Sequence, residues 1–332
     1  MRKRLPCSEE ICPSRILSVA LAVPFALAVA ACTTSDGAPG GAVDAGSAQS
    51  DAGSSADAVG STDDARVDAP SASDATAGAD ASLVGWTLTW SDEFNAADGT
   101  PADATKWTND VSGNGNGNHE REFYTAGAAN AVQRGGSLVI TATTAGASAH
   151  TCWYGPCLYT SARLVTKGHF AQKYGRMSAR IQLPSGQGMW PAFWMLGDDI
   201  DTKQWPACGE IDVMENIGKE PSTNHGTLHA TGYAGAGLGG AYALPGQAKL
   251  SDDFHVYAIE WDAAGIRFYV DSALYETRTP ADVPQGGTWP FDHPFFLLLN
   301  VAVGGDWPGD PDATTVFPQT MRVDWVRVYT KS

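Results

Sequence analysis

Apolar and polar residues alternate with a period of two in several short segments of the chain. In residues 176–183 and 266–271 every second residue is apolar, and the residues between are mostly charged or polar. An Asp-Ala-Ala-Gly turn at residues 262–265 joins the second segment to residues 254–261, which are also rich in β-branched and aromatic side chains. This period is typical of β-strands with one buried face, and the turn makes the last two segments a hairpin.

Four further segments have the composition and length of strands: residues 137–143, 209–216, 295–303 and 321–330. Turns rich in glycine and proline separate these segments, and patterns of helical period are scarce. Many short strands joined by such turns predict an all-β protein, folded as a sandwich of two stacked antiparallel sheets.

The N-terminal residues 1–32 have the pattern of an export signal. Basic residues open the chain, and an apolar run of 16 residues follows at 16–31, which is too short for a comfortable membrane span. The run ends Val-Ala-Ala just before Cys32, as in a bacterial lipoprotein signal whose cysteine is lipidated. An ordinary secretory peptide cleaved near Ala31 is the alternative. We therefore expect an exported protein, either a cell-surface or outer-membrane lipoprotein or a secreted one.

Residues 33–83 consist almost entirely of Ala, Asp, Gly, Ser and Thr, with nine aspartates, one arginine and no aromatic residue. Such a segment cannot bury enough apolar surface to offset the loss of chain entropy on folding. We therefore expect a disordered acidic linker that tethers the following domain.

Residues 84–332 form the predicted globular domain and contain all 11 tryptophans of the chain. The whole chain has a formal net charge of −16, and an acidic surface argues against nucleic acid as a partner and, less strongly, against sulfated or uronic polysaccharides. Contact with a membrane is expected only through the lipid anchor, and we expect a monomer. Cys152 and Cys157 flank a tight Trp-Tyr-Gly-Pro loop and can pair after export, which leaves Cys208 buried or free.

The segment Gly-Glu-Ile-Asp-Val-Met-Glu-Asn at residues 209–216 places three carboxylates within six residues. Glu210 and Asp212 lie two residues apart and share one face of a strand, but in a regular strand Glu215 would point into the core. An uncompensated buried carboxylate costs several kcal/mol. A β-bulge at residues 213–214 would return Glu215 to the face of the other two acids. We therefore predict a bulged strand with three acids on one concave surface.

Crowded carboxylates raise the pKa of one group and keep another ionised. Glycoside hydrolysis requires this split, because one carboxylate attacks while a second carboxylic acid protonates the leaving group. We assign Glu210 as the nucleophile, Glu215 as the general acid and then base, and Asp212 as the charge between them that tunes both. A calcium site or a solvated acidic edge is the alternative interpretation of the bare pattern.

The motif Glu-Ile-Asp-Val-Met-Glu resembles the signature of glycoside hydrolase family 16, in the bulged form typical of laminarinases. The resemblance continues in order along residues 90–330, through the segments 159–163, 174–176, 188–196, 254–257, 300–305 and 323–329. It implies a β-jelly roll with a concave substrate cleft and a retaining endo-1,3-β-glucanase that needs no cofactor for catalysis. The implied partner is a β-glucan polysaccharide, including mixed 1,3-1,4 glucans.

The resemblance also implies residues that contact the sugar. Indole rings stack on the apolar face of a pyranose, and Trp190 and Trp194 would do so beside the scissile bond, while Trp205 would lie on the rim of the cleft. Phe193, between the first two, is assigned to the core. Single aromatic residues are more often ordinary core residues, so this assignment depends on the family pattern.

Polar contacts follow from the same resemblance. Asn118 would bind a sugar hydroxyl and Glu120 would brace its loop, but Glu122 stands where the family usually has glutamine. Arg163 would reach sugar hydroxyls or pair with Glu120. His229 matches a histidine near the acid/base, with an ordinary structural histidine as the alternative.

Family members often hold a structural calcium on the convex side. Asp324 would supply a carboxylate, Gly136 a backbone carbonyl and Glu93 a further oxygen, a set of hard ligands that suits calcium. A buried aspartate that accepts backbone hydrogen bonds is the alternative for Asp324.

Two other functions remain open at this stage. One is an agarase- or carrageenase-like hydrolase, since such members of the family share the bulged motif. The other is a non-catalytic β-glucan-binding module. The Trp-Pro-Ala-Phe-Trp-Met stretch and the acidic surface favour a glucanase over the first, and the presence of all three acids argues against the second.

Overall fold

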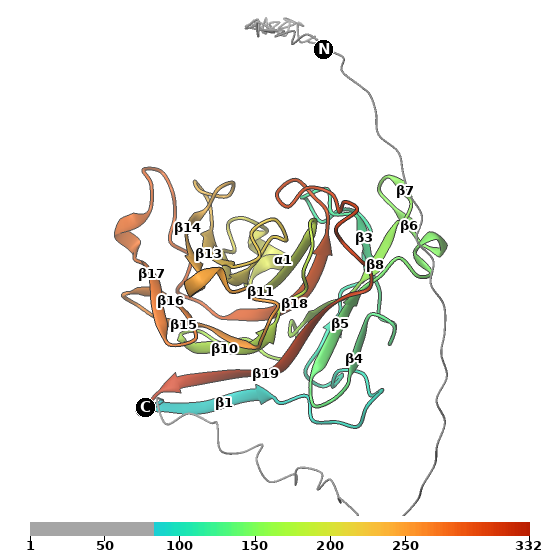
Figure 1. The fold of residues 1–332 in the computed structure, drawn as a ribbon. Helices are drawn as coiled ribbons and strands as arrows, with labels where there is room; N and C mark the ends of the chain where they lie inside the picture. Colours follow the sequence, from blue (N-terminus) through green and yellow to red (C-terminus); the bar gives the residue numbers. More distant parts are fainter. Residues whose placement is uncertain (1–82) are drawn as a thin grey trace, which may run out of the picture. The chain divides into compact units, whose positions relative to one another are not determined.

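The computed structural model describes residues 83–332, which fold around two large β-sheets (Figure 1). The predicted signal peptide, with Cys32, and all of the predicted linker except its last residue lie outside the described residues. In the part that is described, no helix is long and apolar enough to cross a membrane.

The first sheet has eight strands, and every neighbouring pair is antiparallel. Its order is β17 (Ala273–Arg278), β16 (Gly265–Val270), β15 (His255–Asp262), β10 (Gly175–Gln182), β19 (Gln319–Lys331), β5 (Leu138–Ala142) and β4 (Ala131–Gln133), with β1 (Trp86–Asp92) paired to β19. The predicted strands 137–143, 176–183, 254–261, 266–271 and 321–330 all lie in this sheet within one or two residues of their expected ends.

The second sheet has seven strands and carries the predicted acidic segment near its middle. Its order is β14 (Leu238–Ala243), β13 (Thr223–His229), β12 (Glu210–Glu215), β11 (Met189–Gly197), β18 (Phe295–Val303), β9 (Arg163–Val165) and β2 (Thr108–Asn109), again antiparallel throughout. The expected sandwich of two stacked antiparallel sheets is confirmed, and the fold is the β-jelly roll.

The remaining elements are small. β3 (Glu122–Tyr124) pairs in parallel with β8 (Tyr159–Ser161), and β6 (Thr151–Cys152) pairs with β7 (Gly155–Pro156) in a short hairpin. Helical structure among the described residues is limited to α1 (Ile200–Lys203) and the 3₁₀ turns η1 (Ala147–Ala149), η2 (Pro245–Gln247) and η3 (Pro280–Asp282). The catalytic machinery must therefore be built on strands and the loops between them.

The apolar face of each sheet packs into one core between the layers. Met177 and Ile181 of β10, like Ile259 of β15, are fully buried against Leu297 and Leu299 of β18 and their neighbours. Phe193 of β11 lies in the same core, as predicted. Since successive side chains of a strand point to opposite faces, the flanking polar and aromatic residues of β11 and β12 project away from the core.

Candidate active site

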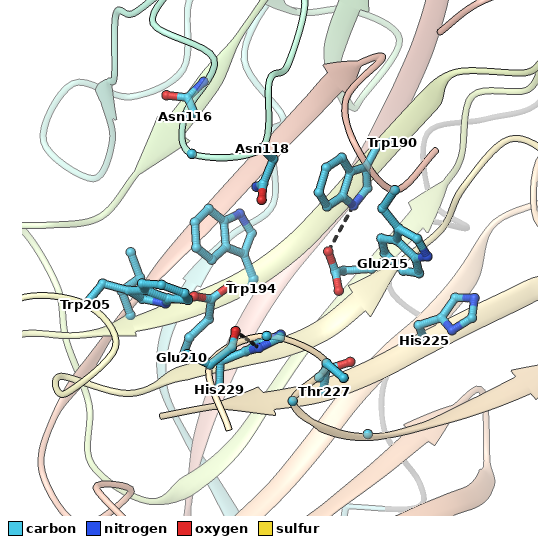
Figure 2. Close-up of a pocket in the computed structure, with 18 of the residues that line it drawn as sticks. Asn116, Asn118, Trp190, Trp194, Trp205, Glu210, Glu215, His225, Thr227 and His229 are labelled. Carbon is cyan, nitrogen blue, oxygen red and sulfur yellow. Dashed lines mark hydrogen bonds between the residues drawn. The ribbon is translucent and has the colours of Figure 1, made fainter. Parts of the chain in front are cut away.

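A cleft of about 960 Å³ lies on the outer face of β11, β12, β13 and β14 (Figure 2). A second, smaller cavity continues from it toward β9 and β18. Every sugar-contact residue predicted from the sequence lines one of the two cavities: Trp190, Trp194, Trp205, Asn118, Glu120, Arg163 and His229. Glu210 and Glu215 line both cavities, and Asp212 lines the inner one.

The predicted bulge is present in β12. Phe193 of β11 pairs with Met214, but the next residue, Trp194, pairs with Asp212, so Val213 has no partner of its own. The same extra residue shifts the register against β13. Val213 and Met214 are fully buried in the core, and Glu215 returns to the face of Glu210 and Asp212. The bulge thus places three carboxyl groups on the floor of one cleft.

Two indole N–H groups point at the two glutamates. Trp190 donates a hydrogen bond of 2.9 Å to Oε1 of Glu215, and Trp205 donates one of 2.5 Å to Oε2 of Glu210 (Figure 2). Trp205 is 49% exposed, as expected of a residue on the rim. Each indole leaves a ring face beside an acid, which is the arrangement needed to stack a sugar next to the reacting bond.

Burial dominates the electrostatics of the three acids. It raises the pKa of Glu210 to about 8, helped by repulsion from Asp212, and the pKa of Glu215 to about 7. The pKa of Asp212, which is only 2% exposed, lies well above its usual range because the group is buried and faces Glu215. Without substrate, the cluster of three carboxyl groups therefore keeps protons bound near neutral pH.

His229 lies beside Asp212 in the cleft. Its Nδ1 lies 3.1 Å from the carbonyl oxygen of Ala234, which can only accept, so Nδ1 carries a hydrogen. Its Nε2 lies 3.2 Å from Oδ2 of Asp212. The two groups attract each other when one of them carries the additional proton.

His229 lines the cleft with both glutamates, and its field lowers the pKa of each. In the β12–β13 ladder His229 pairs with Glu210, and the residue opposite Glu215 is His225. The sequence analysis missed His225, which lies four residues before His229 on β13 and also lines the cleft. The bulge and the antiparallel register decide which residues face each other, so no local pattern points to this pair.

Trp307 and Asn116 were also missed by the sequence analysis. The Trp307 ring packs edge-on against Trp190 at 5.5 Å and against His225 at 5.0 Å, and it lines the cleft at the end nearer Glu215. Asn116 lines the opposite wall together with Asn118. Both missed residues lie in glycine-rich loops without periodic pattern, so only their residue types could have drawn attention to them.

Glu120 braces its loop as predicted. Its buried carboxylate accepts hydrogen bonds from Asn116 at 3.0 Å, Asn118 at 3.3 Å and the Tyr124 hydroxyl at 3.1 Å. The Tyr124 oxygen in turn accepts from Asn300 at 3.2 Å. A chain of buried hydrogen bonds therefore links the asparagine loop to the floor of the cleft.

This chain of hydrogen bonds ends at Trp194. Its indole N–H donates 2.7 Å to the side-chain oxygen of Asn300, which fixes the tilt of the ring. Arg163 lies beneath this region, with its guanidinium 4.6 Å from the centre of the Tyr124 ring and 3.2 Å from Asp110. Its ion-pair partner is thus Asp110 rather than the alternative, Glu120.

Glu122, which replaces the expected glutamine, is fully buried in β3. It accepts a hydrogen bond of 2.6 Å from the backbone N–H of Val303. Burial and the nearby Glu120 raise its pKa well above the usual range. A protonated carboxyl group offers both a donor and an acceptor, as the side-chain amide of glutamine does, so a neutral Glu122 can replace glutamine here.

The calcium site stays a prediction that the structure does not support. Asp324 pairs with Arg180 at 2.7 Å, and the carboxylate of Glu93 binds Arg327 through both oxygens, at 2.8 and 3.0 Å. Each carboxylate of the predicted set already has a cationic partner, and Gly136 supplies only a backbone carbonyl. In residues 83–332, the one group of three acidic or histidine side chains close enough to share an ion is instead Glu210, Asp212 and His229, within 4.8 Å of one another.

The predicted disulfide between Cys152 and Cys157 is present, with 5.1 Å between the two Cα atoms. Cys208 is a free, buried thiol whose pKa burial raises to about 11, which makes it unreactive.

Comparison with known proteins identifies the family. Residues 116–327 match the model of the glycosyl hydrolases family 16. The chain is 45% identical to a β-glucanase from Rhodothermus marinus, over 74% of this chain and 85% of that protein. It also superposes on the laminarinase catalytic domain from Thermotoga maritima, with a TM-score of 0.69, 45% identity, and coverage of 74% of this chain and 99% of that one.

The endo-β-1,3-glucanase from Pyrococcus furiosus is similar to the same degree, with a TM-score of 0.69, 44% identity, and coverage of 74% and 95%. The family match covers more than half of the chain, and the relatives are covered over nearly their whole length. This protein belongs to glycosyl hydrolase family 16.

Proposed function

We propose that the protein is an endo-acting β-1,3-glucanase that cleaves laminarin-like glucans with retention of configuration. The observation that carries the proposal is the pair Glu210 and Glu215 on the floor of an aromatic-lined cleft, each with an indole N–H donor. Relatives that are laminarinases and β-glucanases support the substrate class.

The reaction proceeds by double displacement. The carboxylate of Glu210 attacks the anomeric carbon while Glu215 gives its proton to the departing glycosidic oxygen. Glu215, now ionised, then takes a proton from a water molecule, which attacks the same carbon and releases Glu210. Two inversions restore the β-configuration. The carboxyl groups supply both the nucleophile and the acid, so the family's chemistry needs no cofactor.

Asp212 is the most deeply buried of the three acids, and its Oδ2 lies 3.2 Å from Nε2 of His229. Its charge adds to the effect of burial in raising the pKa of Glu210, in line with the predicted role of Asp212 as the charge that tunes the glutamates. In the proposed mechanism Asp212 is protonated, so this repulsion is absent when Glu210 ionises as the nucleophile, while Glu215 keeps the proton needed for departure of the leaving group.

The cleft suits cleavage within a chain. Trp205 lies beside Glu210 at one end of the cleft (Figure 2). Trp307 packs against Trp190, which donates to Glu215, and so lies nearer the other acid. Sugar units can therefore lie on both sides of the scissile bond. Trp190 and Trp194 supply indole faces beside the acids, and Asn118 and Arg163 supply donors for sugar hydroxyls.

The carrageenase-like alternative fits less well. Carrageenan is sulfated and would need cationic side chains along the cleft, whereas the described residues that line the two cavities include one arginine, Arg163, and no lysine. Agarose is neutral, so it is not excluded on this ground. A non-catalytic glucan-binding role would leave the cluster of Glu210, Asp212 and Glu215 without a purpose, although burying three carboxyl groups is costly.

Export remains a proposal that rests on the sequence. The apolar run before Cys32 and the buried Cys152–Cys157 disulfide both suit a protein that matures outside the cytoplasm. The lipid on Cys32 would anchor a monomeric enzyme close to a polymeric substrate too large to enter the cell.

Replacing either catalytic glutamate tests the mechanism. We expect Glu210→Gln and Glu215→Gln each to lower kcat on laminarin by at least roughly 10³-fold, with little change in the unfolding temperature. Glu260→Gln, on the opposite sheet, is the control and should keep normal activity. Azide should rescue Glu210→Gly with an α-glycosyl azide as product, and Glu215→Ala with a β-glycosyl azide. Near-normal turnover by Glu215→Gln would refute the assignment.

A panel of polysaccharides tests the substrate. Laminarin and curdlan should give a ladder of oligosaccharides early in the reaction, with the β-anomer at each new reducing end when followed by NMR. Mixed-linkage glucan should be cut more slowly. Rapid hydrolysis of agarose or carrageenan, with laminarin untouched, would reject the substrate class and leave the mechanism standing.

Metabolic labelling with a radioactive fatty acid tests the anchor. The full-length protein should carry the label in a bacterial host, and Cys32→Ala should lose it but still be exported. A mature N-terminus at any residue other than 32, found by mass spectrometry, would contradict lipidation.

A further inference from the structure

The segment of residues 113–121, here called the binding segment, has little regular structure of its own. It carries Asn116 and Asn118 into the cleft. Four of the five residues 115–119 have positive φ angles, and two of them, Asn116 and His119, are not glycine. Residues other than glycine adopt this conformation infrequently, although asparagine and histidine do so more often than most. Hydrogen bonds within the segment and contacts with neighbouring loops together hold it in place.

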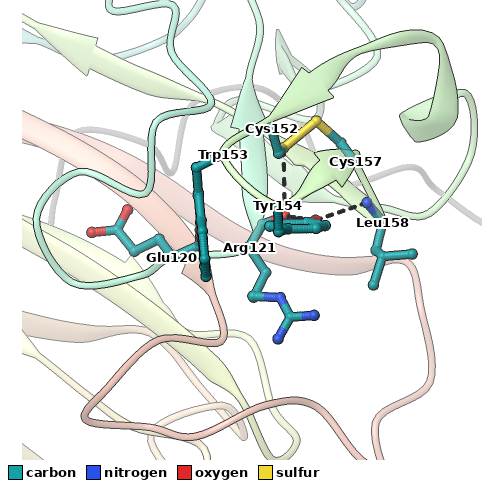
Figure 3. The surroundings of a disulfide bond; sticks show 7 residues. All are labelled: Glu120, Arg121, Cys152, Trp153, Tyr154, Cys157 and Leu158. Carbon is teal, nitrogen blue, oxygen red and sulfur yellow. Dashed lines mark hydrogen bonds between the residues drawn. A yellow bond between two sulfur atoms is a disulfide. The ribbon is translucent and has the colours of Figure 1, made fainter.

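The short hairpin of residues 151–157, here called the disulfide hairpin, packs directly behind this segment (Figure 3). Trp153 at the tip of the hairpin is not part of the hydrophobic core, since the residue is 48% exposed. Its indole N–H nevertheless donates 2.8 Å to the carbonyl oxygen of Glu120, and its backbone N–H donates 2.8 Å to that of Gly113. One residue thus ties both ends of the binding segment.

The ring of Trp153 also covers the middle of the segment. A Cβ atom on Gly115 would lie 2.8 Å from two atoms of the indole, so the ring rests on the bare backbone of this glycine. His119 packs edge-on against the same ring at 5.2 Å. The neighbouring Tyr154 donates 2.5 Å from its hydroxyl to the carbonyl oxygen of Arg121, and the Arg121 guanidinium lies 4.7 Å from the centre of the tyrosine ring.

The disulfide closes this hairpin at its base. Only two residue pairs, Thr151 with Pro156 and Cys152 with Gly155, form its ladder, which is too short to be stable alone. Cys152 and Cys157 are buried beneath the tip and join its two arms. Without the bond the tip loses the constraint that fixes Trp153 against the segment.

We propose that the disulfide hairpin is a clamp that holds the binding segment in its substrate-binding conformation, with Trp153 as the positioning residue. The proposal rests on the proposed role of Asn118 in binding glucan. Within residues 83–332, no hydrogen bond, ion pair or ring contact joins the hairpin to Glu210, Asp212 or Glu215, so the clamp acts on binding of the polysaccharide and leaves the chemical step unchanged. Oxidation after export then completes the binding site and not merely the fold.

Kinetics of matched variants test the clamp. Trp153→Ala should raise KM for laminarin by about five- to tenfold, the effect of one lost hydrogen bond and its packing, with kcat changed by less than about twofold. Trp153→Phe keeps an aromatic ring and loses the N–H donor, so its KM should lie between those of the wild type and Trp153→Ala. Leu158→Ala, an exposed position beside the hairpin, is the control and should match the wild type.

Removing the disulfide should have the same effect. The double variant Cys152→Ser/Cys157→Ser should show the raised KM, and dithiothreitol should raise the KM of the wild type but not that of the double variant. Cys208 is present in both proteins, so reactions at that thiol cannot account for a difference between them.

Hydrogen exchange tests the clamp without any substrate. The amides of Asn118 and Glu120 both donate to the carbonyl oxygen of Gly115, and they should exchange faster in Trp153→Ala than in the wild type. Unchanged exchange and unchanged KM in Trp153→Ala and in the double cysteine variant would overturn the proposal. So would a loss of stability that lowers kcat and leaves KM alone. An enzyme inactive on every glucan would instead refute the proposed function, because the exchange measurement would still report on the clamp.

Discussion

The burial of three carboxyl groups on one strand is the constraint on which the rest of the site depends. Glu210, Asp212 and Glu215 lie along six residues of β12, where the field of each raises the pKa of its neighbours. Such a cluster is unfavourable unless protons, indole donors and a histidine compensate for it. The cleft supplies indole donors and a histidine, and retaining glycoside hydrolysis requires one ionised and one protonated carboxyl group.

The jelly roll provides the rigidity that this cluster needs. β12 lies between β11 and β13 in the middle of the seven-stranded sheet, and Ile211, Val213 and Met214 anchor its other face in the core. Because Val213 and Met214 of the bulge are buried in the core, the positions of the three acids are set by the fold and not by flexible loops. The loops instead bring Asn118 and Trp307 to the cleft, and the disulfide hairpin contacts the loop that carries Asn118.

Much of this arrangement could be predicted from the sequence, and the reasons differ from element to element. The alternation in β10 and β16 and the apolar run of β18 define strands directly, and the spacing of Glu210, Asp212 and Glu215 requires a bulge. β11 was not predicted as a strand, and its segment was noted only for its aromatic motif, because Pro191 and a nearly continuous apolar stretch hide its period. Partners across strands, such as His225 opposite Glu215, depend on register, which no local pattern records. The arginine partners of Glu93 and Asp324 likewise lie far from them in the sequence, so no local pattern points to these pairs.

The proposed mechanism depends on Asp212 being protonated in the free enzyme. NMR of protein labelled with ¹³C at aspartate carboxyl groups, titrated from pH 3 to pH 9, tests this most directly. The signal of Asp212, identified by its absence in Asp212→Asn, should remain that of a protonated carboxyl at pH values where the exposed aspartates have ionised, and should titrate far above their range. An Asp212 signal that titrates together with the exposed aspartates would show a charged residue between the two glutamates. That result would contradict the proposed route by which Glu210 becomes an ionised nucleophile.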